Sequence, residues 1–112
     1  MEMNDAVTVL AGLAQETRLA IFRLLVEVGP GGMRAGMIAE RLELPHATLS
    51  FHLSQLCHAG LLKSRRDGRR ILYAVDFKTM NGLVAYLTEN CCAGGDNCET
   101  TGDTICSTNE GT

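Results

Sequence analysis

No apolar run in this sequence approaches the roughly 20 residues that a helix needs to cross a bilayer, and no signal peptide precedes the first amphipathic segment. We therefore expect a cytoplasmic protein with no membrane partner. The sequence also lacks paired carboxylates, a nucleophile beside a base and a phosphate-binding loop. These absences argue against an enzyme and against an organic cofactor. At 112 residues there is room for one small domain, which a partner subunit would help to stabilise.

Basic residues are missing from the end of the chain. All 10 lysines and arginines lie at or before Lys78. Residues 91–112 instead contain four acidic residues, namely Asp96, Glu99, Asp103 and Glu110. This tail produces the net charge of −3 and hides a basic cluster between Lys63 and Arg70. An acidic average therefore does not exclude a nucleic-acid partner.

Cysteines are concentrated in the same tail. Four of the five lie in the last 22 residues: Cys91, Cys92, Cys98 and Cys106. In a reducing cytosol such a cluster favours metal-binding or reactive thiols over a structural disulfide, which stays as the alternative. The surrounding Gly, Asp, Asn, Thr and Ser residues cannot form a core, so residues 91–112 are predicted to be a flexible tail. The fifth cysteine, Cys57, is expected to act as a small buried hydrophobe.

Apolar residues at helical spacing predict four helices in the first 60 residues. The first covers about residues 6–14, with Asn4 or Asp5 as its cap. The second is expected to end at Gly29 and to bury Leu19, Ile21, Phe22, Leu24, Leu25 and Val28. The third, within residues 33–42, is expected to bury Met37, Ile38, Ala39 and Leu42. After a three-residue link the fourth turns Leu49, Leu53 and Leu56 inward, so the last two helices indicate a helix-turn-helix.

From Leu61 the pattern becomes extended. Residues 62–66 and 69–75 are predicted strands joined by Asp67-Gly68, a pair that favours a type I′ turn. A helix-turn-helix followed by a basic hairpin is a winged helix. Residues 1–90 are therefore predicted to form a mainly α (α+β) winged helix-turn-helix domain with a two-stranded β-hairpin wing, which binds DNA and dimerises.

A last helix is predicted over residues 77–90. Together with the first helix it offers an apolar seam for a homodimer, because too little chain surrounds it to enclose it. The seam residues are expected to be Val7, Leu10, Met80, Leu83, Val84 and Leu87. The alternative is that this helix docks on the core of its own subunit.

The fourth helix is predicted to enter the major groove of double-stranded operator DNA. Its expected contact residues are His46, Thr48, Ser50, Phe51, His52 and Gln55, although His52 could instead bond to the neighbouring helix. The wing is expected to meet phosphates or the minor groove through Arg65, Arg66, Arg69 and Arg70. The alternative is a solvated surface, but it explains poorly an outward phenylalanine and four arginines around one turn.

The sequence resembles the ArsR/SmtB family of winged-helix repressors over about residues 6–90. The likeness is carried by Ala11-Gly12-Leu13-Ala14, Glu16-Thr17-Arg18-Leu19-Ala20-Ile21, Leu24-Leu25, Ile38-Ala39-Glu40-Arg41-Leu42, Leu49-Ser50-Phe51-His52-Leu53, Leu56 and Ala59-Gly60-Leu61-Leu62. The resemblance implies a homodimeric transcriptional repressor that leaves a palindromic operator when its inducer binds.

The sequence departs from the family pattern at the start of the recognition helix and in the residues that would bind the inducer. Many members begin the recognition helix with Ser, whereas Pro45 stands here and is expected to start the helical turn. The best-known arsenic sensors carry Cys-x-Cys on the preceding helix, but residues 32–39 contain no cysteine. The zinc sensors use His on the last helix, and residues 77–90 contain no His. Cys91, Cys92 and Cys98 instead look like the variant that binds arsenic through a C-terminal Cys-Cys-x5-Cys cluster.

The chemistry of the cluster suits As(III) as inducer, and Sb(III) as well, because three thiolates satisfy a thiophilic ion that keeps a lone pair. Zinc normally takes four ligands, of which Cys106 could be the last. Cys106 ranks below the other three cysteines. A repressor of the same fold that responds to zinc, to another soft metal or to thiol oxidation stays as the alternative, and a metal-buffering thiol protein without DNA binding is the alternative from another class.

Overall fold

The computed structural model describes residues 1–94. Cys98, Cys106 and the acidic residues of the tail lie outside these residues. Within them, the elements along the chain are α1 (Met3–Leu13), α2 (Glu16–Val28), β1 (Met33–Arg34), α3 (Ala35–Leu42), α4 (His46–His58), β2 (Leu62–Asp67), β3 (Arg70–Val75) and α5 (Phe77–Leu87). The fold is mainly helical with a small antiparallel sheet, which confirms the predicted winged helix-turn-helix.

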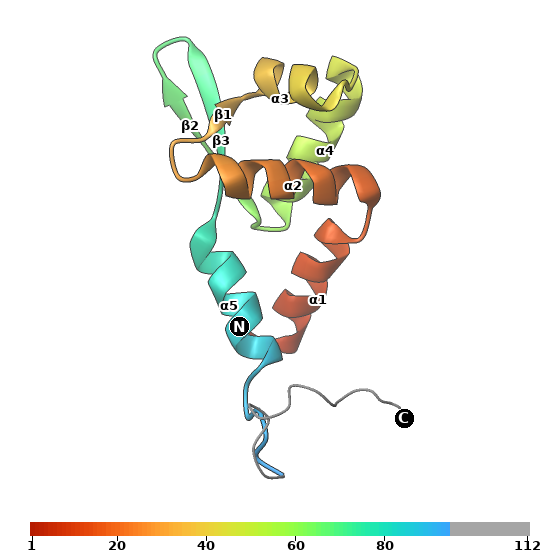
Figure 1. The fold of residues 1–112 in the computed structure, drawn as a ribbon, viewed down its shortest axis with the longest axis vertical. Helices are drawn as coiled ribbons and strands as arrows, with labels where there is room; N and C mark the ends of the chain where they lie inside the picture. Colours follow the sequence, from red (N-terminus) through yellow and green to blue (C-terminus); the bar gives the residue numbers. More distant parts are fainter. Residues whose placement is uncertain (95–112) are drawn as a thin grey trace.

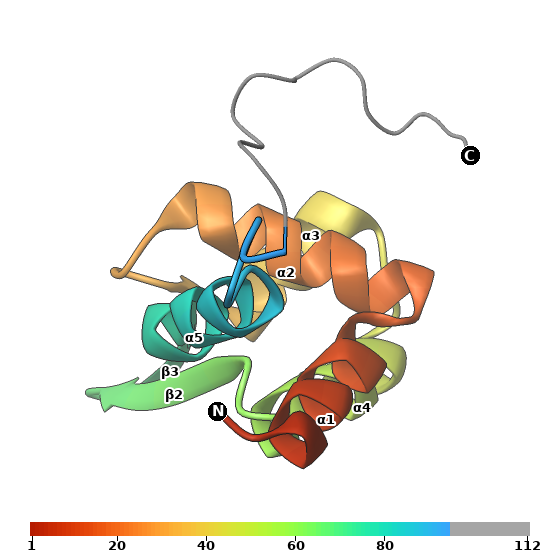
Figure 2. The same cartoon turned by 90° about the horizontal axis from the view of Figure 1, so that it is seen from below.

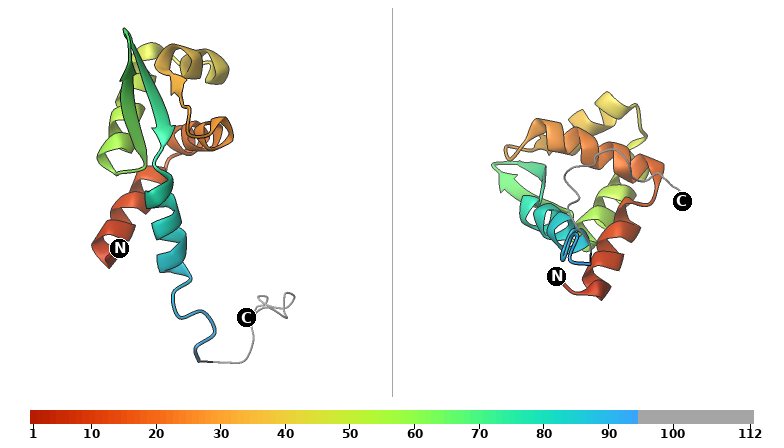
Figure 3. Two further views of the ribbon diagram at one scale, coloured as in Figure 1. Left: turned by 90° about the vertical axis from the view of Figure 1, so that its left-hand side faces the viewer. Right: turned by 60° about the horizontal axis from the view of Figure 1, so that its bottom comes forward.

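The elements divide between two ends of the molecule. Figure 1 shows α3, α4 and the β2–β3 hairpin at one end, α2 crossing the middle, and α1 and α5 descending toward the other end. The view from below shows α1 and α5 in front of α2 and α4 (Figure 2). The side view shows α5 leading away from the hairpin (Figure 3). The helix-turn-helix and wing thus lie together at one end, and α1 and α5 extend toward the other. Among residues 1–94, no helix is long and apolar enough to cross a membrane.

An aliphatic core joins α2, α3, α4 and the sheet. Its fully buried large side chains are Ile21, Leu25, Ile38, Leu49, Leu56, Leu61 and Val75. The three leucines predicted to turn inward from α4 are all buried, which confirms the orientation of that helix. Burying each such side chain contributes roughly 1.5–3 kcal/mol. The orientation of α4 is therefore fixed by packing within one chain.

Two residues that were predicted to be buried are exposed. Leu19 is 42% exposed and Met37 is 37% exposed. At 100° per residue, Leu19 lies about 160° around α2 from the fully buried Ile21. Met37 lies about 100° around α3 from Ile38, on the side away from Ala39. Both helices bury a narrower face than the apolar pattern suggested.

The ends of α1 and α5 also differ from the prediction. The N-cap of α1 is Glu2 instead of Asn4 or Asp5. The Asp5 carboxylate accepts a hydrogen bond from the backbone N–H of Glu2 at 3.0 Å. Asp5 therefore helps to cap α1 from a position within the first helical turn. At the other end α5 stops at Leu87 instead of residue 90. Asn90 and Cys92 have φ values of 61° and 64°, which lie in the left-handed region and cannot continue an α-helix.

The link between α3 and α4 is short and holds the two helices in a helix-turn-helix. Glu43 closes α3 in the left-handed conformation, with φ 55°. Pro45 is the N-cap of α4, with ψ 146°, so it is extended and does not begin the helical turn as predicted. His46 is the first helical residue, as expected.

The sheet has three strands in the order β1-β3-β2, and the sequence did not predict β1. β1 is only two residues long and pairs Met33 with Tyr73. The wing turn is shifted by one residue from the prediction, because Asp67 pairs with Arg70 and leaves Gly68-Arg69 as the loop. Of these two only Gly68 has positive φ, 67°, which fits a type II′ turn and not type I′.

Candidate nucleic-acid interface and thiol site

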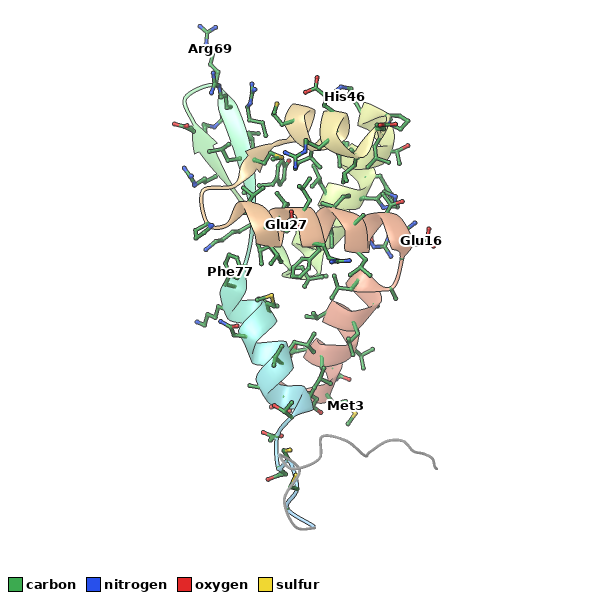
Figure 4. The ribbon with its side chains drawn as sticks, in the orientation of Figure 1. Met3, Glu16, Glu27, His46, Arg69 and Phe77 are labelled. Atoms are coloured by element: carbon green, nitrogen blue, oxygen red, sulfur yellow. The ribbon has the colours of Figure 1, made fainter. Side chains whose placement is uncertain are left out.

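The outer face of α4 carries the side chains that were predicted to meet DNA. Five of the six are exposed: His46, Thr48, Ser50, Phe51 and Gln55. Phe51 is 58% exposed, so its ring points outward as the sequence predicted. Figure 4 shows His46 and Arg69 at the same end of the molecule, opposite Met3. The recognition helix and the wing therefore present one combined surface.

His52 differs from its neighbours on α4 because it is half-buried. Its ring lies against the Phe51 ring in an edge-on arrangement, with 5.5 Å between the centroids. Its Nδ1 atom is buried and has no hydrogen-bond partner in the described part of the chain. The suggested bond from His52 to a neighbouring helix is therefore not formed through Nδ1. The imidazole instead supports Phe51 by ring contact.

The wing arginines are all exposed, but they are not equivalent. Arg69 lies in the turn, and Arg70 stands directly opposite Asp67 across the strands. Arg65 donates a hydrogen bond from Nη2 to the backbone carbonyl of Gly31 at 2.9 Å. Sequence reasoning missed this Gly31 contact, because the two residues are 34 positions apart and nothing local signals it.

The predicted dimer residues mostly lie on an uncovered surface. Val7, Leu10, Val84 and Leu87 are between 42% and 58% exposed in the single chain. Leu83 is only 7% exposed and belongs to the core of its own subunit, and Met80 packs beside it on that core. The alternative reading, in which α5 docks on the core of its own subunit, holds for Leu83 and Met80. The helix docks on its own chain through one edge and leaves another edge bare.

The end of α1 is fastened to the rest of the fold by a residue that sequence reasoning did not single out. Arg18 donates from Nε to the carbonyl of Gly12 at 2.7 Å, and its backbone N–H is accepted by the Gln15 side chain. A Cβ on Gly12 would stand 2.9 Å from that of Ala59, so α1 meets the end of α4 without a gap. This contact holds α1 at a fixed angle to the recognition helix.

The first two tail cysteines follow directly after α5. Their Sγ atoms lie 3.4 Å apart, and Cys92 is disulfide-bonded in this structure. Cys98 and Cys106 lie outside the described residues. Within residues 1–94 no group of three or more His, Cys, Asp and Glu side chains is placed to hold a metal ion, so a three-thiolate site would need a ligand from residues beyond 94.

Cys57 lies in a different environment from the tail cysteines. It packs half-buried against the core from α4. Burial raises the pKa of its thiol above the ordinary value, because the thiolate would lose hydration there. Cys57 thus lies at the edge of the core, as predicted, but it is half-buried and not fully buried.

Comparison with known sequences agrees with the class that the fold defines, a DNA-binding winged helix-turn-helix regulator. Residues 13–65 match a family described as a helix-turn-helix domain. The transcriptional activator HlyU of Vibrio cholerae serotype O1 is 30% identical over 89 residues, which span 78% of this chain and 80% of HlyU. The HTH-type transcriptional regulator YgaV of Escherichia coli K12 is 31% identical over 89 residues, which span 80% of this chain and 88% of YgaV.

Solved structures give the more specific assignment. An ArsR-like transcriptional regulator from Rhodococcus sp. RHA1 has a TM-score of 0.68 and 31% identity, covering 81% of this chain and 82% of its own. The repressor PagR of Bacillus anthracis has a TM-score of 0.65 and 27% identity, covering 76% and 94%. A possible transcriptional regulator for arsenical resistance has a TM-score of 0.60 and 28% identity, covering 71% and 79%. The chain belongs to the ArsR family of transcriptional regulators, and it is a DNA-binding protein and not an enzyme.

Proposed function

We propose that two copies of this chain form a repressor that binds a palindromic operator and releases it when As(III) binds Cys91, Cys92 and Cys98. Sb(III) has the same preference for thiolates and would act in the same way. The observation that carries the proposal is the pair of adjacent sulfurs, 3.4 Å apart, on residues that follow α5. Figure 1 shows that α5 leads away from α3, α4 and the wing. An ion bound by these sulfurs can alter DNA affinity without touching the DNA.

The dimer would form through α1 and α5. The bare edge of these helices contains Val7, Leu10, Val84 and Leu87, and a second copy would remove these side chains from water. A two-fold dimer places two α4 helices on successive turns of one DNA face, with half-sites about 34–36 Å apart or a multiple of that distance. A palindromic operator follows from this symmetry.

On the DNA, each part of the surface has its own task. His46, Thr48, Ser50 and Gln55 would bond to base edges or nearby phosphates, and Phe51 would pack on a thymine methyl group. His52 would hold Phe51 in place through the ring contact. Arg66, Arg69 and Arg70 would neutralise phosphates or enter the minor groove.

Cys91 and Cys92, whose Sγ atoms lie 3.4 Å apart, would supply two of the three thiolates that a pyramidal trivalent ion takes. A third thiolate, from Cys98, would complete the pyramid, and Gly94 and Gly95 permit the chain to turn back. Because thiolates are required, the disulfide at Cys92 must be reduced before the ion binds.

Binding of the ion would shift α5, and with it the seam between the subunits. The two α4 helices would then no longer match the operator half-sites. A coupling of about 3 kcal/mol already weakens DNA binding more than 100-fold, so the change in the seam can be small. This energy comes from tighter binding of the ion to the DNA-free form.

The test is release of a duplex that the wild-type protein selects from a random pool, measured in a thiol-free reductant. We expect arsenite to weaken binding by about 100-fold or more. Cys91→Ser, Cys92→Ser and Cys98→Ser should keep the starting affinity and lose this response. Cys57→Ala is the matched control and should respond like the wild type. Release that persists in all three serine variants would remove the site assignment.

Oxidation of the tail thiols is the second candidate signal, because the exposed Cys91 is accessible to oxidants. The same duplex titrated with peroxide, zinc and arsenite separates these inputs. A response to peroxide with none to arsenite under reduction would replace the ion by a redox signal. The relatives include both the activator HlyU and the repressor PagR, so a reporter gene behind the selected duplex tests the sign of regulation.

A further inference from the structure

We propose that Arg65 is a positioning residue that fixes the wing at the correct distance from the helix-turn-helix, and that it is not a phosphate contact. This inference rests on the proposed use of the wing in DNA binding. The inference gives Arg65 a different role from Arg66, Arg69 and Arg70, although all four are charged and exposed.

The first observation is the path of the Arg65 side chain. Arg65 lies on the edge strand β2 and pairs with Leu72 of the central strand β3. On the far side of β3, Leu72 pairs with Arg34 of β1. The guanidinium reaches the carbonyl of Gly31, in the loop just before β1, with an Nη2 to oxygen distance of 2.9 Å. The bond therefore joins the wing to the opposite edge of the sheet.

The second observation is that the loop which receives this bond is itself pressed against β3. Gly32 has a φ of 77°, and a Cβ there would stand only 2.7 Å from the carbonyl oxygen of Tyr73. Only glycine combines that backbone conformation with so close an approach. The loop thus lies directly against β3 at Gly32, and the hydrogen bond from Arg65 holds the preceding residue, Gly31.

The third observation is where the loop leads. β1 is only two residues long, and Arg34, its last residue, is the N-cap of α3. Any movement of the loop therefore passes directly to the first helix of the helix-turn-helix. DNA binding requires α4 in the major groove and the wing on the neighbouring backbone at the same time. The hydrogen bond from Arg65 to Gly31 therefore holds the wing in a fixed position relative to the helix-turn-helix.

Arg66 provides an internal comparison. Successive side chains of a strand point to opposite faces of the sheet, so Arg66 lies on the other face from Arg65. It has the same charge on the same strand, but it lies away from the loop at Gly31. The two arginines therefore separate the effect of charge from the effect of the bond.

The test is a double-mutant cycle with Arg69→Ala, using the duplex selected by the wild-type protein. Removing an independent phosphate contact costs a similar factor in any background, whereas removing a positioning bond makes the other wing contacts form less often. We expect Arg69→Ala to weaken wild-type binding about tenfold. In the Arg65→Ala background the same change should cost less than about threefold.

Gly32→Ala disturbs the contact between the same loop and β3 without changing any charge. It should also weaken DNA binding and reduce the cost of Arg69→Ala. Arg65→Lys keeps a donor at the end of the side chain and should recover part of the coupling. Circular dichroism of each variant checks that it is folded, and Arg65→Ala, a change at an exposed site, keeps the test decisive if Gly32→Ala does not fold.

Three results would overturn the inference. One is an equal cost of Arg69→Ala in the wild-type and Arg65→Ala backgrounds, with a salt slope lowered by about 0.9 for Arg65→Ala alone, the signature of a phosphate contact. Another is that the cost of Arg69→Ala falls equally in the Arg66→Ala background. The reduced cost would then be a general effect of removing charge and not of removing the hydrogen bond. Absence of wild-type binding to any duplex would instead refute the proposed function, and this inference with it.

Discussion

The two ends of this molecule bury their apolar residues in different ways. At the DNA-reading end, α4 turns Leu49, Leu53 and Leu56 into a core that is complete within one chain. At the other end, α1 and α5 leave Val7 and Val84 more than half exposed. The reading surface thus has its shape before any partner or ligand arrives. The opposite end depends on what covers it.

This difference suits a regulator. A helix that reads base edges must be held rigidly, since a small misplacement spoils several hydrogen bonds at once. An element that transmits a signal needs two arrangements of similar free energy, and a marginally covered surface provides them more easily than a packed core. The contact of Gly12 with Ala59 joins the two ends, because α1 there meets the end of α4 directly.

The largest expected effect would come from a cavity at the reading end. Leu56 is fully buried, so Leu56→Ala should lower the free energy of unfolding by about 2–5 kcal/mol. Leu87 at the other end is 57% exposed, and Leu87→Ala should cost less than about 1 kcal/mol in the single chain. Urea unfolding at concentrations where both variants are monomeric gives the two values. Equal losses of unfolding free energy in the two variants would contradict the difference in packing between the two ends.

The next effect concerns the uncovered edge of α5. Val84→Asp would place a charge in the proposed seam, where losing its hydration costs several kcal/mol, so the dimer dissociation constant should rise about 100-fold or more. Ala85→Asp adds the same charge about 160° around the helix from Leu87 and is the matched control. Sedimentation velocity over a range of concentrations measures both variants. An unchanged dissociation constant for Val84→Asp would place the interface elsewhere.

The smallest effect concerns the thiol of Cys57, at the edge of the core. Because burial raises the pKa of Cys57, a smaller fraction of it is thiolate at pH 8, and it should react with iodoacetamide more slowly in the folded protein than in urea. The contrast should shrink as the pH rises toward the folded pKa and both forms ionise. Mass spectrometry of the peptide that contains Cys57 gives the rates. A folded rate equal to the unfolded one would show that the core edge does not protect this thiol.

The sequence predicted the reading end well because its signals are local. Leucines at spacings of three and four fixed the inward face of α4, and Phe51 points outward as predicted. Gly29 ended α2 as expected, with φ 90°. A pattern that a single helix must satisfy can be read without knowing what lies beside it.

Predictions that depended on neighbours were less accurate. Leu19 matched the apolar pattern of α2 but faces water, because the core that α2 covers is narrower than its apolar stripe. The two-residue strand β1 has no pattern of its own and exists only because β3 pairs with it. The turn slipped by one position, since pairing of Asp67 with Arg70 set the register of the hairpin.

By itself the sequence determined the helix-turn-helix, the basic wing and the separation of cysteines from arginines, because helix periodicity, composition and charge are properties of neighbouring residues. Only the tertiary structure decided that α5 buries Leu83 and exposes Val84, and that Arg65 is bonded across the sheet to Gly31. Those outcomes follow from which surfaces meet in three dimensions. Contacts between residues far apart in the chain leave no trace in local spacing.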